Sequence, residues 1–261
     1  MKSKVRIIAR LDIKAPNLIK GINLEGVRVV GDPQKFATDY YLNGIDEIIY
    51  MDAVATLYGR NNLSEVVMRT SENIFVPLTV GGGIRSLEDV DQLMASGADK
   101  VALNSAAIKN PDLISKIAKK YGSQAVVLSI EAKRIGTGSD WEAYIDNGRE
   151  KTGIDVRQWV DLAVPLGVGE ILVTSVDQEG TQLGFDVELM KIVSDRVSIP
   201  VIASGGMGAL DHASDVVLNG NVDAIAIGHL LHYQKLKLAE LRSFLLRKNI
   251  EVVEHASGAF M

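Results

Sequence analysis

The sequence has no cysteine, no long apolar run and no excess of basic charge. Without cysteine, disulfides, thiolate nucleophiles and cysteine-ligated zinc or iron–sulfur centres are excluded. No apolar run approaches the roughly 20 residues that a membrane-spanning helix needs. No secretory-signal pattern precedes the strand-like segment 5–9. We therefore expect a cytoplasmic protein that does not associate with a membrane.

Positive charge is not concentrated anywhere along the chain. The formal net charge is −5, from 28 Lys and Arg against 33 Asp and Glu, with the two signs interspersed. The basic stripe that is typical of nucleic-acid-binding proteins is missing. We therefore predict no nucleic-acid partner, and any anionic ligand must be held by a local arrangement of groups. We also expect no bound metal ion and no cofactor.

Short β-branched runs alternate with longer amphipathic stretches along the whole chain of 261 residues. This alternation is typical of parallel strands covered by crossover helices. Eight strands are predicted, at 5–9, 47–51, 76–80, 100–103, 125–130, 170–174, 200–203 and 224–227. The length fits the roughly 250 residues of one (β/α)8 barrel, and eight strands favour closure, so we predict a single α/β TIM barrel. A doubly wound open sheet would alternate strands and helices too, but it would not predict two matching four-strand halves.

The second half of the sequence repeats the first at an offset of about 120 residues. Segment 77–83 (PLTVGGG) matches 200–206 (PVIASGG), 44–49 matches 167–172, and 97–103 matches 221–227. We therefore predict two similar half-barrels, about residues 1–122 and 123–250, followed by a short C-terminal tail, 251–261.

Two carboxylates follow predicted strands at equivalent places in this repeat. Asp12 closes the first strand and Glu131 the fifth. Because side chains at the C-terminal ends of barrel strands face the active-site mouth, we predict that the pair lies on opposite walls of one cavity. General acid–base catalysis needs such an arrangement. Solvated loop carboxylates are the alternative, since most Asp and Glu are exposed.

Glycine-rich loops follow the third and seventh predicted strands. Glycine lets backbone N–H groups approach an anion closely, although tight turns also use glycine without any ligand. We predict one phosphate site in each half, and hence a phosphorylated substrate with a phosphate at each end. The candidate residues are Gly83, Asn104 and Ser105 in the first half and Ser204, Gly205, Gly206 and Gly228 in the second.

Four charged residues stand at strand starts, at the opposite end of the predicted barrel. They are Arg6, Glu47, Lys100 and Glu170. Strand alternation turns them inward if they share the phase of the barrel interior, and two cations and two anions then form a ring. A stabilising ion-pair cluster and a functional ring are equally compatible with the residues alone.

Several segments together resemble the cyclase subunit of imidazole glycerol phosphate synthase. They are RLDIK at 10–14, IKG at 19–21, TVGGGI at 79–84, GADKV at 97–101, YGSQA at 121–125 and ASGG at 203–206, and the likeness runs from about residue 4 to residue 250. In that family a glutaminase subunit docks on the N-terminal barrel face. Its ammonia passes through the barrel to a bisphosphorylated substrate in histidine biosynthesis.

The resemblance implies roles for particular residues. It makes Asp12 and Glu131 the catalytic pair, assigns the four strand-start charges to an ammonia gate, and implies a glutaminase partner. The substrate-binding and phosphate-binding positions that it implies are Lys20, Gly83, Asn104, Ser105, Asp177, Glu179, Gly180, Ser204, Gly205, Gly206 and Gly228.

The chain departs from the family pattern around the mouth. Glu131 and Glu179 stand where that family has Asp, Arg10 replaces a small residue, and Ala-Pro-Asn at 15–17 replaces Asp-Gly-Arg. Moving a carboxylate by about 1 Å can cost roughly a hundredfold in rate. These departures, with segments 58–62 and 130–134, resemble a sister branch from bacterial surface-polysaccharide gene sets. There the barrel is thought to supply ammonia to a separate sugar amidotransferase.

Three functions therefore stay open. The first is a glutamine-dependent cyclase, and the second is a subunit that conducts ammonia for another enzyme. The third is the related sugar-phosphate isomerase of the histidine pathway, which shares the two-half barrel and works alone; the charged ring counts against it.

Overall fold

Eight parallel strands form a closed barrel in the computed structural model, which describes residues 4–53 and 63–254. Segment 58–62 and most of the C-terminal tail lie outside these ranges. The barrel strands are β1 (Arg6–Lys14), β4 (Glu47–Asp52), β5 (Leu78–Gly81), β6 (Lys100–Leu103), β7 (Val126–Arg134), β10 (Glu170–Ser175), β11 (Val201–Ser204) and β12 (Ala224–Ile227). Each pairs with its neighbours in parallel, and pairing of β10 with β7 completes the circle. The predicted (β/α)8 barrel is confirmed.

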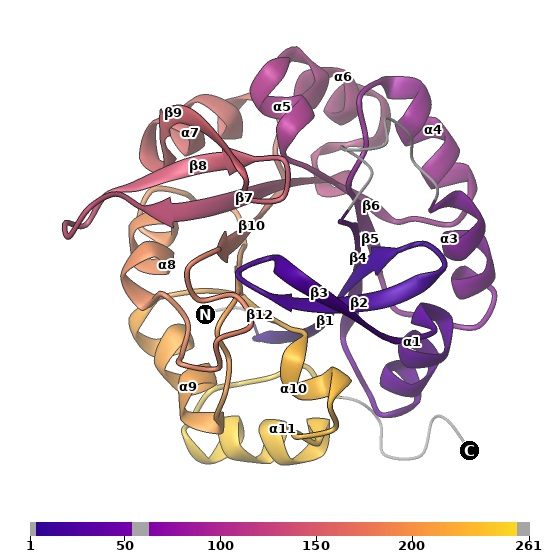
Figure 1. Cartoon of the computed structure of the whole chain (residues 1–261), viewed down its shortest axis with the longest axis vertical. Helices are drawn as coiled ribbons and strands as arrows, with labels where there is room; N and C mark the ends of the chain where they lie inside the picture. Colours follow the sequence, from indigo (N-terminus) through magenta and orange to yellow (C-terminus); the bar gives the residue numbers. More distant parts are fainter. Residues whose placement is uncertain (1–3, 54–62, 255–261) are drawn as a thin grey trace.

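Helices form a ring around the strands (Figure 1). They are α1 (Pro33–Leu42), α3 (Ser64–Ser71), α4 (Leu87–Ala95), α5 (Ser105–Lys109), α6 (Asp112–Tyr121), α7 (Val156–Ala163), α8 (Val187–Ser194), α9 (Leu210–Asn219), α10 (His229–His232) and α11 (Leu238–Arg247), with short 3-10 turns η1 (Ser123–Ala125) and η2 (Val164–Leu166). Ser86 caps α4 through a capping box with Asp89, and Asp155 caps α7. Within the described ranges, no helix is long and apolar enough to span a bilayer.

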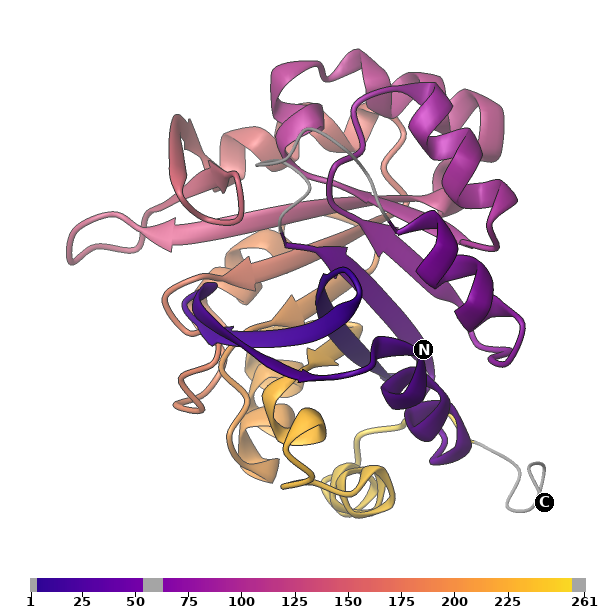
Figure 2. The ribbon, with the colours of Figure 1, turned by 45° about the vertical axis from the view of Figure 1, so that its right-hand side comes forward.

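Both β1 and β7 continue beyond the barrel into antiparallel excursions that the sequence analysis did not predict. β1 pairs with β2 (Asn17–Ile22), which pairs with β3 (Glu25–Gly31), and β7 pairs with β8 (Trp141–Ile145), which pairs with β9 (Glu150–Asp155). The β2–β3 hairpin lies across the C-terminal ends of the barrel strands (Figures 1 and 2). We call this end the mouth.

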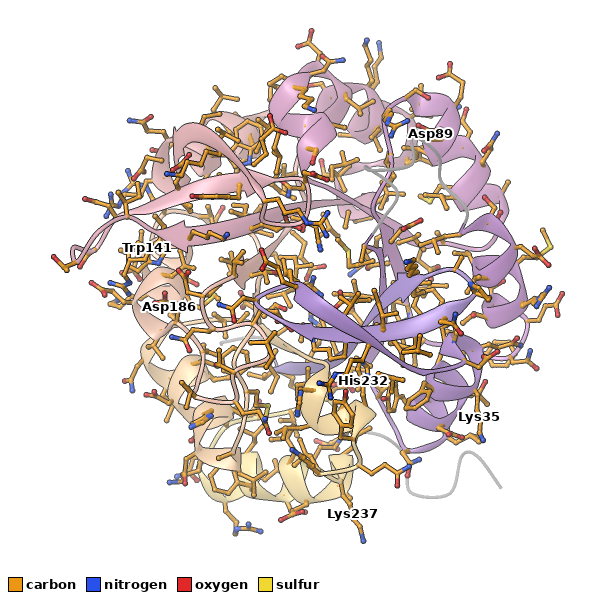
Figure 3. All side chains as sticks on the ribbon, viewed as in Figure 1. Lys35, Asp89, Trp141, Asp186, His232 and Lys237 are labelled. Atoms are coloured by element: carbon orange, nitrogen blue, oxygen red, sulfur yellow. The ribbon has the colours of Figure 1, made fainter. Side chains whose placement is uncertain are left out.

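The second excursion is fixed to the outer wall. Trp141 on β8 donates from Nε1 to Asp186 Oδ2 at 3.0 Å, and Asp186 is the N-cap of α8 (Figure 3). The Arg134 guanidinium lies 4.2 Å from the centre of the Trp141 ring. A cation over an indole face stabilises the packing of β7 against β8, and the hydrogen bond of Trp141 to Asp186 holds this hairpin on α8.

Strand alternation separates two apolar cores. Ile7, Ala9 and Leu11 on β1 pack between the barrel and its helices. Ile8 belongs instead to a separate cluster inside the barrel, with Ile49, Met51, Ala102, Val127, Leu172, Ile202, Ala224 and Ala226. The period of two therefore places Arg6, Arg10 and Asp12 on the inward face of β1 as well.

Candidate functional site

Asp12 lies buried in the mouth, bonded to two cations. Arg10 donates from Nε to Asp12 Oδ1 at 3.0 Å, and Lys20 donates from Nζ to Asp12 Oδ2 at 3.3 Å. The β2–β3 hairpin delivers Lys20, which also forms an ion pair with buried Glu179. The structure thus brings three predicted site residues together with Arg10, whose partners the sequence did not reveal.

Glu131 lies across the mouth in a different environment. Its Oε2 accepts a hydrogen bond from the Gly148 backbone N–H at 2.8 Å. No ion pair joins it to a cation among the described residues. Both Asp12 and Glu131 are buried, which excludes the alternative of solvated loop carboxylates.

These environments push the two pKa values apart. Burial raises the pKa of Glu131 to about 7, against the opposing charge of Arg10 and the Gly148 N–H. Burial also acts to raise the pKa of Asp12, but Arg10 and Lys20 outweigh it and hold that pKa at about 2. Near neutral pH Glu131 can therefore give or take a proton, whereas Asp12 stays ionised.

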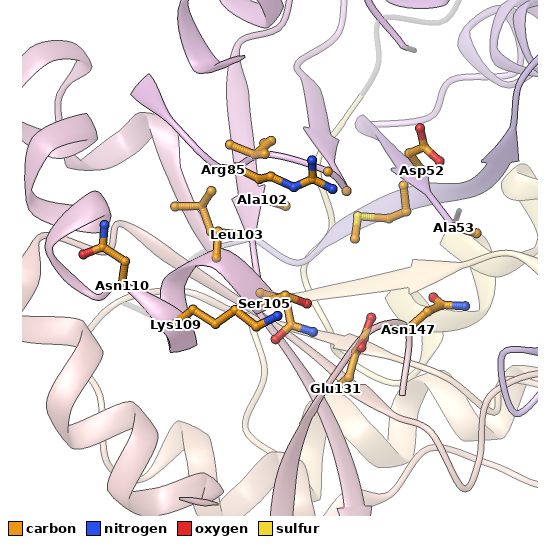
Figure 4. Close-up of a pocket in the computed structure, with 16 residues that line it drawn as sticks. Asp52, Ala53, Arg85, Ala102, Leu103, Ser105, Lys109, Asn110, Glu131 and Asn147 are labelled. Atoms are coloured by element: carbon orange, nitrogen blue, oxygen red, sulfur yellow. The ribbon is translucent and has the colours of Figure 1, made fainter. Parts of the chain in front are cut away.

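An open cavity of about 370 Å³ adjoins Glu131 on the N-terminal half, which comprises β1, β4, β5 and β6 (Figure 4). Its lining includes Gly83, Asn104 and Ser105, as predicted for one phosphate site. Lys109 also lines it, from the end of α5. Further lining residues are Asp52, Gly82, Arg85, Asn110 and Asn147.

The cavity wall is partly built from the second excursion. Ser105 Oγ accepts from the Asp146 backbone N–H at 3.1 Å, and Asn104 Nδ2 donates to the Tyr144 carbonyl oxygen at 3.1 Å. The Oδ1 atoms of Asn104 and Asp146 are buried without a hydrogen-bond partner. Of the two, Asn104 lines the cavity, and its acceptor oxygen suits a ligand that carries hydroxyl or N–H donors beside its anionic group.

The corresponding place in the C-terminal half, which comprises β7, β10, β11 and β12, is nearly closed. About 20 Å³ is open directly between Arg10, Lys20, Glu179 and the residues Gly180, Ser204, Gly205, Gly206 and Gly228, while a separate cavity of about 650 Å³ on the β2–β3 side shares Lys20 with it. A Cβ atom on Gly228 would lie 3.3 Å from Lys20 Nζ, so the ammonium group sits directly against this loop. The glycine loop predicted to bind the second phosphate is thus surrounded by the side chains of Arg10, Lys20 and Glu179.

Asp177 is separated from both cavities. Its Oδ2 accepts from the Arg134 backbone N–H at 2.8 Å, which directs the side chain to the base of the β7–β8 hairpin.

His232 is a residue near the mouth that the sequence analysis missed. Its Nδ1 lies 2.7 Å from the Tyr40 hydroxyl, and burial lowers its pKa to about 3, so it is neutral. A lone His in a helical segment carries no signal that predicts this position.

The four charged residues at strand starts do form a ring at the N-terminal end. Glu47 accepts from Arg6 Nη1 at 2.6 Å and from Lys100 Nζ at 3.1 Å. Glu170 accepts from Arg6 Nη2 and from Lys100 Nζ, the latter at 2.9 Å. Each charge has two opposite partners, so the ring closes the barrel floor beneath the inner apolar cluster. We call it the charged ring.

A two-layered (β/α)8 barrel with carboxylates and glycine loops at its mouth defines the class of this protein as a TIM barrel with an enzyme-like polar site. Residues 6–237 match the family model described as "Histidine biosynthesis protein". The chain belongs to this histidine biosynthesis protein family.

Three curated relatives of this chain share one name. An imidazole glycerol phosphate synthase subunit HisF from Legionella pneumophila is 66% identical over 209 residues, which are 80% of this chain and 98% of that protein. The protein of the same name from Prochlorococcus marinus strain MIT 9301 is 44% identical, over 95% of this chain and 97% of its own length. The one from strain SARG is 43% identical, over 94% of this chain and 96% of its own length.

Proposed function

We propose that this chain is the cyclase-type subunit of an imidazole glycerol phosphate synthase. In this role it takes ammonia from a glutaminase at its N-terminal face and uses it at the mouth on a bisphosphorylated substrate. The arrangement along one axis carries the proposal. The charged ring, the inner apolar cluster and the carboxylate pair follow one another through the barrel.

Each of these three levels suits one step in the proposed passage and use of ammonia. The charged ring would act as the gate, because opening it requires only rearrangement of side chains such as Lys100, which bridges Glu47 and Glu170. The apolar layer would pass neutral ammonia and disfavour ammonium. At the mouth Glu131, with a pKa of about 7, would exchange the protons of ring closure.

The substrate would span the mouth between the two loops. One phosphate would bind in the open cavity beside Gly83, Asn104 and Ser105. The other would bind beside Gly206 and Gly228, with Lys20 released from Glu179 to contact it. Asp177, bonded to the β7–β8 hairpin, would contribute by holding that loop.

A second candidate is a subunit that conducts ammonia to a separate sugar amidotransferase in surface-polysaccharide synthesis. The ion pair of Arg10 with Asp12 favours it, since it occupies one member of the carboxylate pair. The charged ring and apolar layer serve both candidates equally. A protein of this second kind would bind the glutaminase and release ammonia without closing a ring.

Turnover of the bisphosphorylated cyclase substrate separates the candidates. The full chain is assayed with ammonium alone and with glutamine plus the glutaminase. For the cyclase we expect turnover in both assays, and Asp12→Asn should lower it by roughly 10² to 10⁴, the usual contribution of acid–base groups. Asp91→Asn, which changes a partly exposed carboxylate bonded to Lys120, is the matched control.

The second candidate gives a different outcome. Glutamine hydrolysis by the partner is then stimulated by the barrel, while neither the wild type nor Glu131→Asp consumes the cyclase substrate. If the barrel neither consumes the substrate nor stimulates the glutaminase, both candidates fail.

A further inference from the structure

Arg10 occupies the barrel interior one inward position below Asp12. It follows Arg6 and Ile8 on the inward face of β1, above the apolar cluster that contains Ile8. Only 3% of its surface is exposed. A buried guanidinium needs partners for its charge and its N–H donors, and these partners determine what else the mouth can do.

The guanidinium reaches across the lumen to strands of the other half. Arg10 Nη1 donates to Thr174 Oγ1 on β10 at 2.7 Å and to Ser204 Oγ on β11 at 3.1 Å. Two strands, β11 and β12, separate β10 from β1 in the barrel. The side chain is therefore held at both ends and spans the floor of the mouth.

Asp12 has no free oxygen as a result. Its Oδ1 accepts from Arg10 Nε and its Oδ2 from Lys20 Nζ. Glu131, by contrast, has one oxygen bonded to a backbone N–H. A carboxylate whose two oxygens each contact a cation is a weak base, because protonation would break both charged contacts.

We propose that Arg10 is a specificity-determining residue, which keeps Asp12 as the anion of an internal ion pair and thereby slows ring closure of a bisphosphorylated substrate at this mouth. The proposal rests on the function proposed above, since it assumes that the substrate reaches the mouth. Lys20 divides its contacts between Asp12 and Glu179. Among the ion pairs of the described residues, Arg10 has Asp12 as its one carboxylate partner.

The test compares variants that remove the charge with and without the volume. Arg10→Ala removes both, and Arg10→Met keeps most of the length without the charge; Lys20 still pairs with Asp12 in each. Arg196→Ala, which breaks an exposed pair with Asp161, is the matched control. Ammonium-dependent turnover of the bisphosphorylated substrate is measured for the full chain, with folding checked by circular dichroism.

We expect Arg10→Ala and Arg10→Met to raise turnover at least about tenfold over the wild type, a fraction of what acid–base groups contribute. Arg196→Ala should match the wild type. Carbon-13 NMR of the Asp12 carboxyl gives an independent reading: its titration midpoint should move up in both Arg10 variants and stay in place in the control.

Turnover that is unchanged or lower in both folded Arg10 variants overturns the proposal, whether or not the Asp12 titration moves. An unmoved titration also overturns it, because Arg10 then does not hold Asp12 as an anion. Stimulation of the glutaminase by the wild-type barrel tests the proposed function separately. Failure there, with turnover raised in the Arg10 variants, would leave the assignment of Arg10 standing.

Discussion

The two glycine loops of the barrel share a backbone and differ in what surrounds them. In the N-terminal half the loop opens on a cavity of about 370 Å³, whereas the equivalent loop of the C-terminal half leaves about 20 Å³. The difference comes from side chains of other segments. Lys20 and Arg10 reach the second loop from β2 and β1, and both elements belong to the first half.

The comparison shows that the repeated sequence determines the backbone of both loops but not which side chains surround them. Gly82 and Gly205 have φ of 93° and 97°, so the loops turn alike. A Cβ atom at Gly82 would lie 2.4 Å from the Asp52 carbonyl oxygen, and one at Gly205 would lie 2.8 Å from that of Ser175. Equivalent strand ends thus crowd both glycines.

The largest expected effect tests this shared backbone. Gly82→Ala and Gly205→Ala should each lower the free energy of unfolding by about 3 kcal/mol, because a left-handed residue with a Cβ is strained and the carbonyl must move. Gly26→Ala, with φ of 59° and open space around it, should cost only about 1 kcal/mol. Urea unfolding followed by circular dichroism measures all three. Equal losses at Gly26 and Gly82 would contradict the crowding.

The carboxylates extend the comparison to pH. The pKa of Glu131 is raised to about 7 from an ordinary value of 4.5, so the folded state holds its proton more tightly than the unfolded state. Ionising the buried Glu131 carboxyl therefore destabilises the folded state. This destabilisation is absent below pH 4.5 and grows until about pH 7, where it reaches on the order of 3 kcal/mol. Glu131→Gln should therefore stabilise the protein more at pH 8 than at pH 5.

The pKa shift of Asp12 has the opposite sign. Its pKa is lowered to about 2 from 3.8, so its contribution is fully present above pH 3.8 and is lost as the pH falls towards 2. Asp12→Asn should lower the free energy of unfolding by about 2 kcal/mol, equally at pH 5 and pH 8. Urea unfolding at the two pH values checks both variants. A pH-independent effect of Glu131→Gln would show that its carboxyl is not buried as described.

The smallest expected effect concerns anion binding. Inorganic phosphate should bind the open cavity first, and Lys109→Met should weaken that site about fivefold, as for one exposed charged contact.

At the second site, Glu179→Gln should free Lys20 and strengthen phosphate binding about tenfold. Backbone amide shifts of Ser105 and Gly228 on phosphate titration report the sites separately. Lys119→Met, an exposed lysine on α6, serves as control. Simultaneous saturation of both sites in the wild type would refute the asymmetry.

Periodicity and repetition predicted the barrel strands well, because each buried strand is a short apolar run bounded by turns. The start of β6, Lys100, and the start of β12, Ala224, agree with the predicted bounds. The excursions were missed because their strands mix polar and apolar residues; β3 and β9 are largely exposed and have no buried face to impose alternation.

The site was predictable where a residue lies on its own barrel strand, as Asp12 does on β1 and Glu131 on β7. It was not predictable where partners come from distant segments. Nothing near Arg10 in the sequence indicates its bonds to Thr174 and Ser204, each more than 160 positions away. Likewise Lys20 was assigned to a substrate loop by resemblance, while its pairing with Glu179 depends on how the hairpin folds over the mouth.

That hairpin also couples the two halves of the barrel to each other. Asn23 donates its backbone N–H to the Glu179 carbonyl oxygen at 2.7 Å, so the first excursion is joined to a loop of the other half. The C-terminal half on its own would carry its glycine loop but lack Lys20, which β2 of the first half provides. Because Lys20 pairs with Glu179, a change at either position has to suit a partner 159 residues away in the sequence. The two halves therefore share one mouth whose parts cannot be altered separately.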